Sequence, residues 1–215
     1  MLTRIGILGD VHGEDARLQA ALQWLRARKV ERVLCVGDVA DGNGDAARAN
    51  RCCTLLREFD VQTVRGNHDR WLLNGEMRDL DGAVNLADLS ASSVEWLRAL
   101  PLELPFETVA GPLLLCHGVG ANDMNKLTPA DTGYALEVNE DLQQLMWGGT
   151  FRFGVGGHTH QRMVKRCGDL VWINPGALPT WSGPCFVMAD FGAKRGEFRG
   201  FNDDRVAAVG EQWAL

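Results

Sequence analysis

The chain contains only five histidines, and each follows a short apolar segment and lies in a glycine-containing stretch typical of a turn. Four blocks hold these histidines and a fifth is a Gly-Asp pair: Gly9-Asp10-Val11-His12-Gly13, Gly37-Asp38, Gly66-Asn67-His68-Asp69, Cys116-His117-Gly118 and Gly157-His158-Thr159-His160. Imidazole nitrogens with carboxylate or amide oxygens suit divalent ions such as Mn²⁺, Fe²⁺, Co²⁺ or Zn²⁺. One histidine in a turn is ordinary loop chemistry, but the joint pattern predicts a metal site.

The segments between the first blocks alternate between strand and helix patterns. Residues 4–8, 32–36 and 61–65 are short apolar runs typical of buried strands, and apolar residues recur at helical spacing within residues 18–25 and 46–56. This order predicts a parallel sheet covered by helices. The carboxyl ends of parallel strands share one edge of a sheet, where ligands bind. We therefore expect the separate turns to converge on one site.

The pattern in the second half of the chain is weaker. Ser92-Ser93-Val94-Glu95 has the form of a capping box, which predicts a short helix that ends before Pro101. Residues 138–146 outline a further amphipathic helix, and residues 153–191 favour short strands separated by turns. No repeat, linker or low-complexity segment divides the sequence. We interpret residues 1–215 as a single domain.

Composition and charge narrow the classes of partner. The net charge is −6 and no Lys/Arg block stands out, so we expect nucleic acid only as a possible substrate. No apolar run is long enough to span a bilayer and the first residues lack the layout of a signal peptide, so no membrane partner is expected. The six cysteines form no CxxC pair, which favours reduced thiols and a cytoplasmic location.

The five blocks resemble the calcineurin-like metallophosphoesterase superfamily. Its pattern is Asp-x-His, Gly-Asp, Gly-Asn-His-(Asp/Glu), a later Gly- or Cys-His, and Gly-His-x-His, and the match runs from Asp10 to His160. The resemblance implies an α/β fold with a two-layered β-sandwich core flanked by helices. It also implies two divalent metal ions at one end of the sandwich, with Mn²⁺ expected and Fe, Zn, Co or Ni as alternatives.

The same resemblance implies a ligand set. The expected ligands are Asp10, His12 and His160 for the first metal, Asn67, His117 and His158 for the second, and Asp38 as a bridge between them. Two metals that share a hydroxide can attack phosphorus in line at neutral pH. His68 is implied to be a catalytic residue that assists the leaving group, with Asp69 orienting its ring. A helix-capping carboxylate is the alternative for Asp69.

The branch of the superfamily is less well defined by the sequence. Protein serine/threonine phosphatases and dinucleoside tetraphosphatases carry Gly-Asp-x-Val-Asp-Arg-Gly, whereas residues 37–43 read Gly-Asp-Val-Ala-Asp-Gly-Asn without the arginine. That guanidinium would clamp a phosphomonoester dianion. The chain therefore looks like the small bacterial and archaeal phosphodiesterase-like members, which also tend to carry an Asn-Pro-Gly turn, here Asn174-Pro175-Gly176. The turn is equally consistent with a plain strand end.

Loops near the blocks could contact a small phosphate-ester substrate. Residues 119–133 contain Asn122, Asn125 and Lys126, which could reach a phosphate. Trp71 could stack on a base, but we favour a place in the core, and Trp181 is open between the two.

Three functions remain open from the sequence: a phosphodiesterase, a phosphomonoesterase of the protein-phosphatase or dinucleotide type, and a non-catalytic binding scaffold. We expect the first. The missing arginine counts against the second. A scaffold should have lost ligands, and every expected ligand is present.

Overall fold

The first half of the chain builds a parallel sheet with helices on its outer face, as predicted. In the computed structural model, which describes residues 1–215, the first elements are β1 (Arg4–Leu8), α1 (Asp15–Ala27), β2 (Arg32–Cys35), α2 (Ala46–Glu58) and β3 (Gln62–Thr63). Strands β1, β2 and β3 pair in parallel. β3 is shorter than the predicted residues 61–65, because only two of these residues pair with β2.

The C-terminal part of the chain completes this first sheet. Its strands are β9 (Cys185–Asp190), β10 (Arg195–Asn202), β11 (Arg205–Val206) and β12 (Glu211–Ala214). The sheet order is β11-β10-β9-β1-β2-β3, and β12 also pairs with β10. The turn after β10 packs on α1, where Arg17 donates to the backbone oxygen of Asp203 at 3.2 Å. After β10 the chain therefore forms a turn and the two edge strands β11 and β12.

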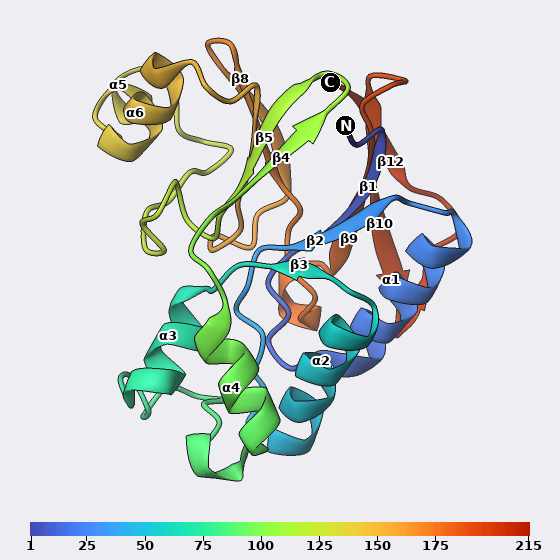
Figure 1. Cartoon of the computed structure of the whole chain (residues 1–215), viewed down its shortest axis with the longest axis vertical. Helices are drawn as coiled ribbons and strands as arrows, with labels where there is room; N and C mark the ends of the chain where they lie inside the picture. Colours follow the sequence, from blue (N-terminus) through green and yellow to red (C-terminus); the bar gives the residue numbers. More distant parts are fainter.

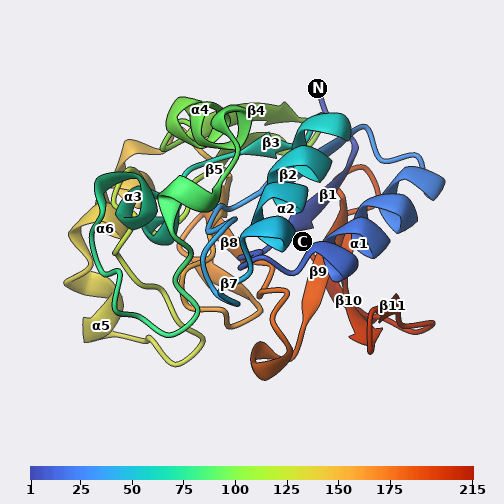
Figure 2. The ribbon, with the colours of Figure 1, turned by 90° about the horizontal axis from the view of Figure 1, so that it is seen from below.

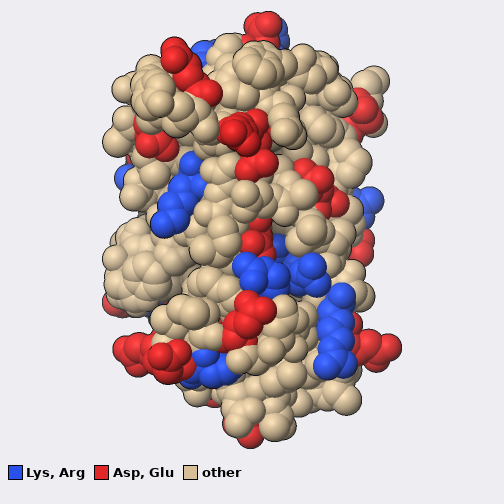
Figure 3. All heavy atoms as spheres, turned by 90° about the vertical axis from the view of Figure 1, so that its left-hand side faces the viewer, with Lys and Arg blue, Asp and Glu red and all other residues tan.

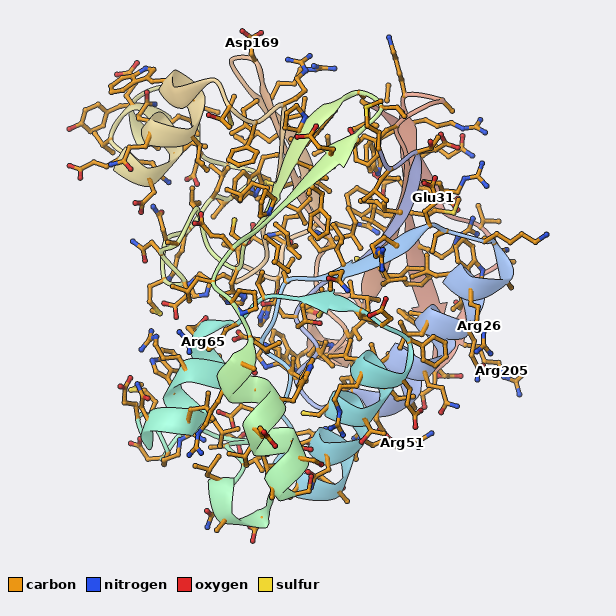
Figure 4. All side chains as sticks on the ribbon, in the orientation of Figure 1. Arg26, Glu31, Arg51, Arg65, Asp169 and Arg205 are labelled. Carbon is orange, nitrogen blue, oxygen red and sulfur yellow. The ribbon has the colours of Figure 1, made fainter.

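A second sheet faces the first (Figure 1). It contains β4 (Leu104–Thr108), β5 (Gly111–Leu115), β6 (Phe153–Val155), β7 (Met163–Cys167) and β8 (Leu170–Asn174), in the order β4-β5-β6-β8-β7. Strands β5, β6 and β8 run parallel, while β4 and β7 are antiparallel edge strands. In Figure 4, Asp169 marks the tip of the β7–β8 turn, at the end of the molecule opposite to α2.

Four more helices and two 3-10 turns lie between the strands. They are α3 (Asn67–Asn74), η1 (Leu86–Asp88), α4 (Ala91–Ala99), α5 (Tyr134–Glu137), α6 (Glu140–Gly148) and η2 (Thr180–Ser182). The predicted capping box at Ser92 is wrong: Ser90 caps α4, and its hydroxyl accepts from the backbone N–H of Ser93 at 3.2 Å. The helix predicted from Val138 starts later, at Glu140, because Asn139 caps it and leaves Val138 exposed.

Three apolar clusters account for the layering. Helices α1 and α2 pack on the outer face of the first sheet, where Figure 2 shows them side by side, and α4 packs on α2. A second cluster, with Ile7 and Leu34 from one sheet and Leu115 and Ile173 from the other, fills the space between the sheets. A third lies under α6 on the far side of the second sheet. The two-layered β-sandwich core flanked by helices is thus confirmed.

The surface and the cysteines agree with the compositional analysis. All six cysteines are buried and unpaired. Figure 3 views the side that carries α3, α5 and α6, where acidic and basic side chains are interspersed among larger uncharged areas. None of the helices is both long and apolar enough to cross a bilayer.

Candidate metal centre

The expected ligands of the first metal lie together at the carboxyl ends of the strands. Asp10 and His12 follow β1, Asp38 follows β2 and His160 follows β6. One potential ligand atom from each of the four lies within 4.8 Å of the others. Oδ2 of Asp10 is buried and has no hydrogen-bond partner, which is costly unless a cation satisfies it. The donor set and this orphaned oxygen both fit a divalent ion.

Backbone contacts fix the direction of the His12 ring. Its Nδ1 lies 2.6 Å from the backbone oxygen of Asp41 and donates to it. The Nε2 lone pair therefore points into the site, where it lies 3.0 Å from Nε2 of His160. Two ring nitrogens at this distance repel unless a proton or a cation lies between them. A hydrogen bond that fixes the far nitrogen is the usual support of a metal-binding histidine.

The expected ligands of the second metal form an adjacent group. Oδ1 of Asn67 lies 2.8 Å from Nε2 of His117 and 2.8 Å from Nδ1 of His158. His117 is held from behind, because its Nδ1 donates to the backbone oxygen of Val36 at 2.7 Å. Nε2 of His158 is buried without a partner. His117 thus has the same support from its far ring nitrogen as His12 in the first group.

Asp38 lies between the two groups. Its Oδ2 is 3.8 Å from Nε2 of His12 and 3.4 Å from Nε2 of His117. Its Oδ1 accepts from the backbone N–H of His68 at 2.8 Å, which ties the carboxylate to the first turn of α3. This is the position that a carboxylate shared by two ions would need.

The backbone at four of the expected ligands adopts a left-handed conformation that non-glycine residues rarely take. The φ angles are +49° at His12, +48° at Asp38, +62° at His158 and +57° at His160. Left-handed backbone at non-glycine residues costs free energy and concentrates at functional sites. Gly66 is needed for close approach, because a Cβ there would lie 2.1 Å from Oδ1 of Asp38.

The ionisable groups of the site disfavour their charged forms. Burial raises the pKa of Asp10 to about 6 and, with the Asp10 charge nearby, raises that of Asp38 well above its usual value. Burial lowers the pKa of His158 and of His160 to about 4. The histidines are therefore neutral near pH 7, which is the form that binds a metal. A divalent cation would reverse the penalty on the carboxylates.

His68 lies beside the cluster, with its ring centroid 5.0 Å from that of His12. Its Nδ1 is 3.9 Å from Oδ2 of Asp41, whose charge opposes the lowering of the His68 pKa by burial. The expectation that Asp69 orients this ring differs from the structure. The Asp69 carboxylate accepts from the backbone N–H groups of Val39 at 2.8 Å and Gly66 at 3.0 Å. It therefore caps α3, and Asp41 is the carboxylate that faces His68.

Asp41 was not singled out from the sequence, although it stands only three positions after Asp38. It is 2% exposed and forms a two-pronged ion pair with Arg78, at 3.1 Å and 2.7 Å. Its Oδ1 also accepts from the backbone N–H of Val84 at 2.9 Å. Arg78 gives no local sequence signal, because it reaches the site from a loop after α3.

The Asn174-Pro175-Gly176 turn has a structural role that the sequence left undecided. Nδ2 of Asn174 donates to the backbone oxygen of Gly157 at 2.9 Å and to Oγ1 of Thr159 at 3.0 Å. It thereby holds the turn that carries His158 and His160. The turn also runs against β1, where a Cβ at Gly9 would lie 1.8 Å from the backbone oxygen of Gly176.

The polar residues of the 119–133 loop do not gather at the metal centre as expected. Nδ2 of Asn122 and of Asn125 donate to Oδ2 of Asp141, at 3.0 Å and 2.5 Å, and so anchor the start of α6. Two charges of this loop act on the site in opposite directions, because Lys126 lowers the pKa of His158 and Asp123 raises it.

Two tryptophans flank the site. Trp71 is half-buried and lies against His68, with ring centroids 4.7 Å apart, so the expected place in the core is wrong. Trp181 is 69% exposed and lies 4.9 Å from His160 between centroids.

Comparison with known proteins agrees with this site. The model of the calcineurin-like phosphoesterase superfamily domain matches residues 3–194, so the chain belongs to that family of metal-dependent phosphoester hydrolases. The candidate metal site of this chain draws its ligands from strand ends of both sheets. That position is consistent with the fold of this family.

Individual relatives are distant. The chain is 28% identical to serine/threonine-protein phosphatase 1 of Salmonella typhimurium, over 83% of this chain and 77% of that protein. It is 32% identical to an uncharacterised protein of Methanocaldococcus jannaschii, but that match spans only 35% of this chain and 30% of the archaeal protein. The metallophosphoesterase of Sphaerobacter thermophilus has the same fold, with a TM-score of 0.72 at 20% identity, covering 94% of this chain and 89% of that one.

Proposed function

We propose that this protein is a two-metal phosphodiesterase that acts on a small substrate. The observation that carries the proposal is the position of Asp38, whose Oδ2 lies within 4 Å of ring nitrogens from both ligand groups. In this proposal the first group binds one ion, the second group binds the other, and Asp38 binds both. Two bound divalent ions supply an activated water and neutralise phosphate oxygens. Mn²⁺ is the ion we propose, since the donors are mixed nitrogen and oxygen.

His68 is the proposed proton donor to the leaving oxygen. Its side chain is 26% exposed, so a substrate can reach it, and its ring lies next to His12 at the edge of the ligand groups. A leaving alkoxide needs a proton as the ester bond breaks, and a positioned histidine can deliver it. Asp41 orients the ring and favours its protonated form, and Arg78 holds Asp41 in place.

The proposed preference for a diester rests on the nearby arginines, which are already paired with carboxylates. A monoester dianion is best bound by a free guanidinium. Arg78 uses both terminal nitrogens on Asp41, and Arg70 forms a two-pronged pair with Asp123 at 2.7 Å and 3.0 Å. Neither is free to clamp a second phosphate charge, which favours the monoanionic diester.

A phosphomonoesterase is the second candidate. The observation that favours it is the similarity to the Salmonella phosphatase over 83% of this chain. The paired state of Arg78 opposes it, because the guanidinium would have to leave Asp41 to reach a phosphate.

The test is a side-by-side assay of bis(p-nitrophenyl) phosphate and p-nitrophenyl phosphate with added Mn²⁺, together with bound-metal analysis. We expect two metals per chain and metal-dependent hydrolysis that favours the diester. A preference for the monoester would keep the metal chemistry and overturn the substrate class. Two bound metals without turnover of either ester would favour the binding-scaffold alternative instead.

We further propose a reducing, cytoplasmic setting. The six cysteines are buried and unpaired, as is usual where thiols stay reduced. The proposed partner is a small phosphate ester, with nucleic acid involved only as a source of such esters.

A further inference from the structure

A row of aromatic rings crosses the proposed active site. The row runs Trp71, His68, His12, His160, Trp181. Successive ring centroids are 4.7 Å, 5.0 Å, 4.9 Å and 4.9 Å apart. The proposed proton donor lies near one end of the row and the first ligand group near the other. The leaving group of a diester would therefore lie towards Trp71, and the retained group towards Trp181.

Trp181 is placed to contact the retained group. It belongs to the short turn η2, its ring is tilted by 45° to that of His160, and 69% of its surface is exposed. Trp147 on α6 is more exposed still, at 81%, so exposure alone means little. What distinguishes Trp181 is that its ring borders two proposed metal ligands, His160 at 4.9 Å and His12 at 6.3 Å between centroids.

A groove lies beside the turn that carries Trp181 and reaches the proposed ligand His160. It has a volume of about 520 Å³ and is lined by His160, by the turn residues Ser182 and Gly183 that follow Trp181, and by Phe201. That volume is in the range of small-ligand sites. Because His160 belongs to both the ligand group and the groove, a group attached to the phosphate can enter it directly.

The charge of the groove favours an uncharged occupant. Its one basic side chain, Arg162, is paired with Glu211 at 3.1 Å. A groove without a free cation suits a neutral planar group better than a further phosphate, and it does not suit a polynucleotide backbone. Tryptophan binds planar π-systems by stacking and does so with little preference among bases.

We propose that Trp181 holds a nucleobase, so that the substrate is a phosphodiester of a single nucleoside whose base stacks on this ring beside the groove. The inference rests on the proposed phosphodiesterase function and specifies its substrate class. Trp181 acts on binding, and the reaction at phosphorus takes place at the ligand groups.

The test compares two esters with the same leaving group, thymidine 5′-(p-nitrophenyl phosphate) and methyl p-nitrophenyl phosphate. The full-length, Mn²⁺-loaded enzyme should have a kcat/KM at least about tenfold higher for the thymidine ester, as expected for one stacked base. Trp181→Ala should lower this ratio about tenfold, and Trp181→Phe should retain most of it. A ratio near one in the parent enzyme, or an unchanged ratio in Trp181→Ala, overturns the inference.

A matched control and a binding assay separate this inference from the proposed function. Trp147→Ala removes an exposed tryptophan from α6, away from the row, and should leave the ratio unchanged. If neither ester is hydrolysed, the phosphodiesterase proposal fails, and AMP binding by equilibrium dialysis then tests Trp181 alone. Weaker binding to Trp181→Ala than to Trp147→Ala supports the base site, and equal binding to both overturns it.

Discussion

Asp38 is the residue on which the two-metal proposal depends, because its Oδ2 approaches the Nε2 atoms of His12 and His117, one from each ligand group. Asp10 also lies near both groups, but it approaches His117 only at Nδ1, which already donates to the backbone oxygen of Val36. Replacing it by Asn removes the negative charge but keeps the shape, so both ions should bind more weakly. We expect Asp38→Asn to lose both metals after gel filtration, as measured by elemental analysis. Asp10→Asn is the matched control, since Asp10 belongs only to the first group and its loss should spare one metal. Two metals retained by Asp38→Asn would exclude the bridging role.

His68 should act on the leaving group and not on metal binding. His68→Ala should keep both metals and slow hydrolysis of esters with poor leaving groups by about 10²–10⁴-fold, the usual contribution of a general acid. The loss should be smallest for nitrophenyl esters, whose leaving group needs no proton. The measurement is kcat across phenyl esters of graded leaving-group pKa. Equal losses along the series would show that His68 does not donate the proton. Asp41→Asn should give a weaker effect of the same kind.

At the scale of elements, the sequence patterns predicted the strands and helices whose formation depends on residues close in the sequence. β1 has its predicted bounds, and α1 and α2 cover the predicted apolar positions, because the periodicity there reflects burial against a single sheet. The composition of the segments and their turn residues alone also predicted that every histidine lies after a strand.

What could not be predicted depends on contacts between distant segments. The role of Asp41 requires Arg78, which is 37 positions away, in the loop after α3. Asn122 and Asn125 were expected near the phosphate, but both bind Asp141, which lies on α6 and not in the metal centre. Trp71 was expected in the core, yet the turn of α3 directs it to His68. The spacing of residues along the sequence does not indicate which of these distant side chains will come together.

Asp69 links the start of helix α3 to a neighbouring turn and so helps to position the residues of the site. Its carboxylate joins the start of α3 to the turn after β2 through two buried backbone N–H groups. Asp69→Ala would leave both donors without a partner, at about 1–3 kcal/mol each, so we expect about 2–6 kcal/mol lower free energy of unfolding. Urea unfolding of chelator-treated protein measures this. Asp45→Ala removes the exposed cap of α2 and should cost only about 1 kcal/mol. Equal effects of the two variants would contradict the tethering role of Asp69.

At the scale of the whole molecule, the metal centre and the central core join the same two layers. Asp10 and Asp38 follow strands of the first sheet, whereas His117 and His158 follow strands of the second. The cluster between the sheets also draws on both halves of the chain, from Ile5 to Phe198. We therefore propose that residues 1–215 are a single domain that unfolds cooperatively.

This proposal predicts a single calorimetric transition that moves as a whole when metal is removed. Each ion that binds only the folded state at about 100 times its Kd stabilises it by about 2.7 kcal/mol, so two ions contribute about 5.4 kcal/mol, which corresponds to a Tm shift of about 10–20 °C for a chain of this size. Chelation should lower Tm by that amount in the parent protein and by much less in Asp38→Asn, whose ligand groups no longer share a carboxylate. Two separate transitions, with only one sensitive to the chelator, would mean that the sheets unfold independently and that the metal centre belongs to one of them. A single transition that shifts with metal requires the ligand groups and the central core to be lost together, because neither sheet holds a complete set of ligands on its own.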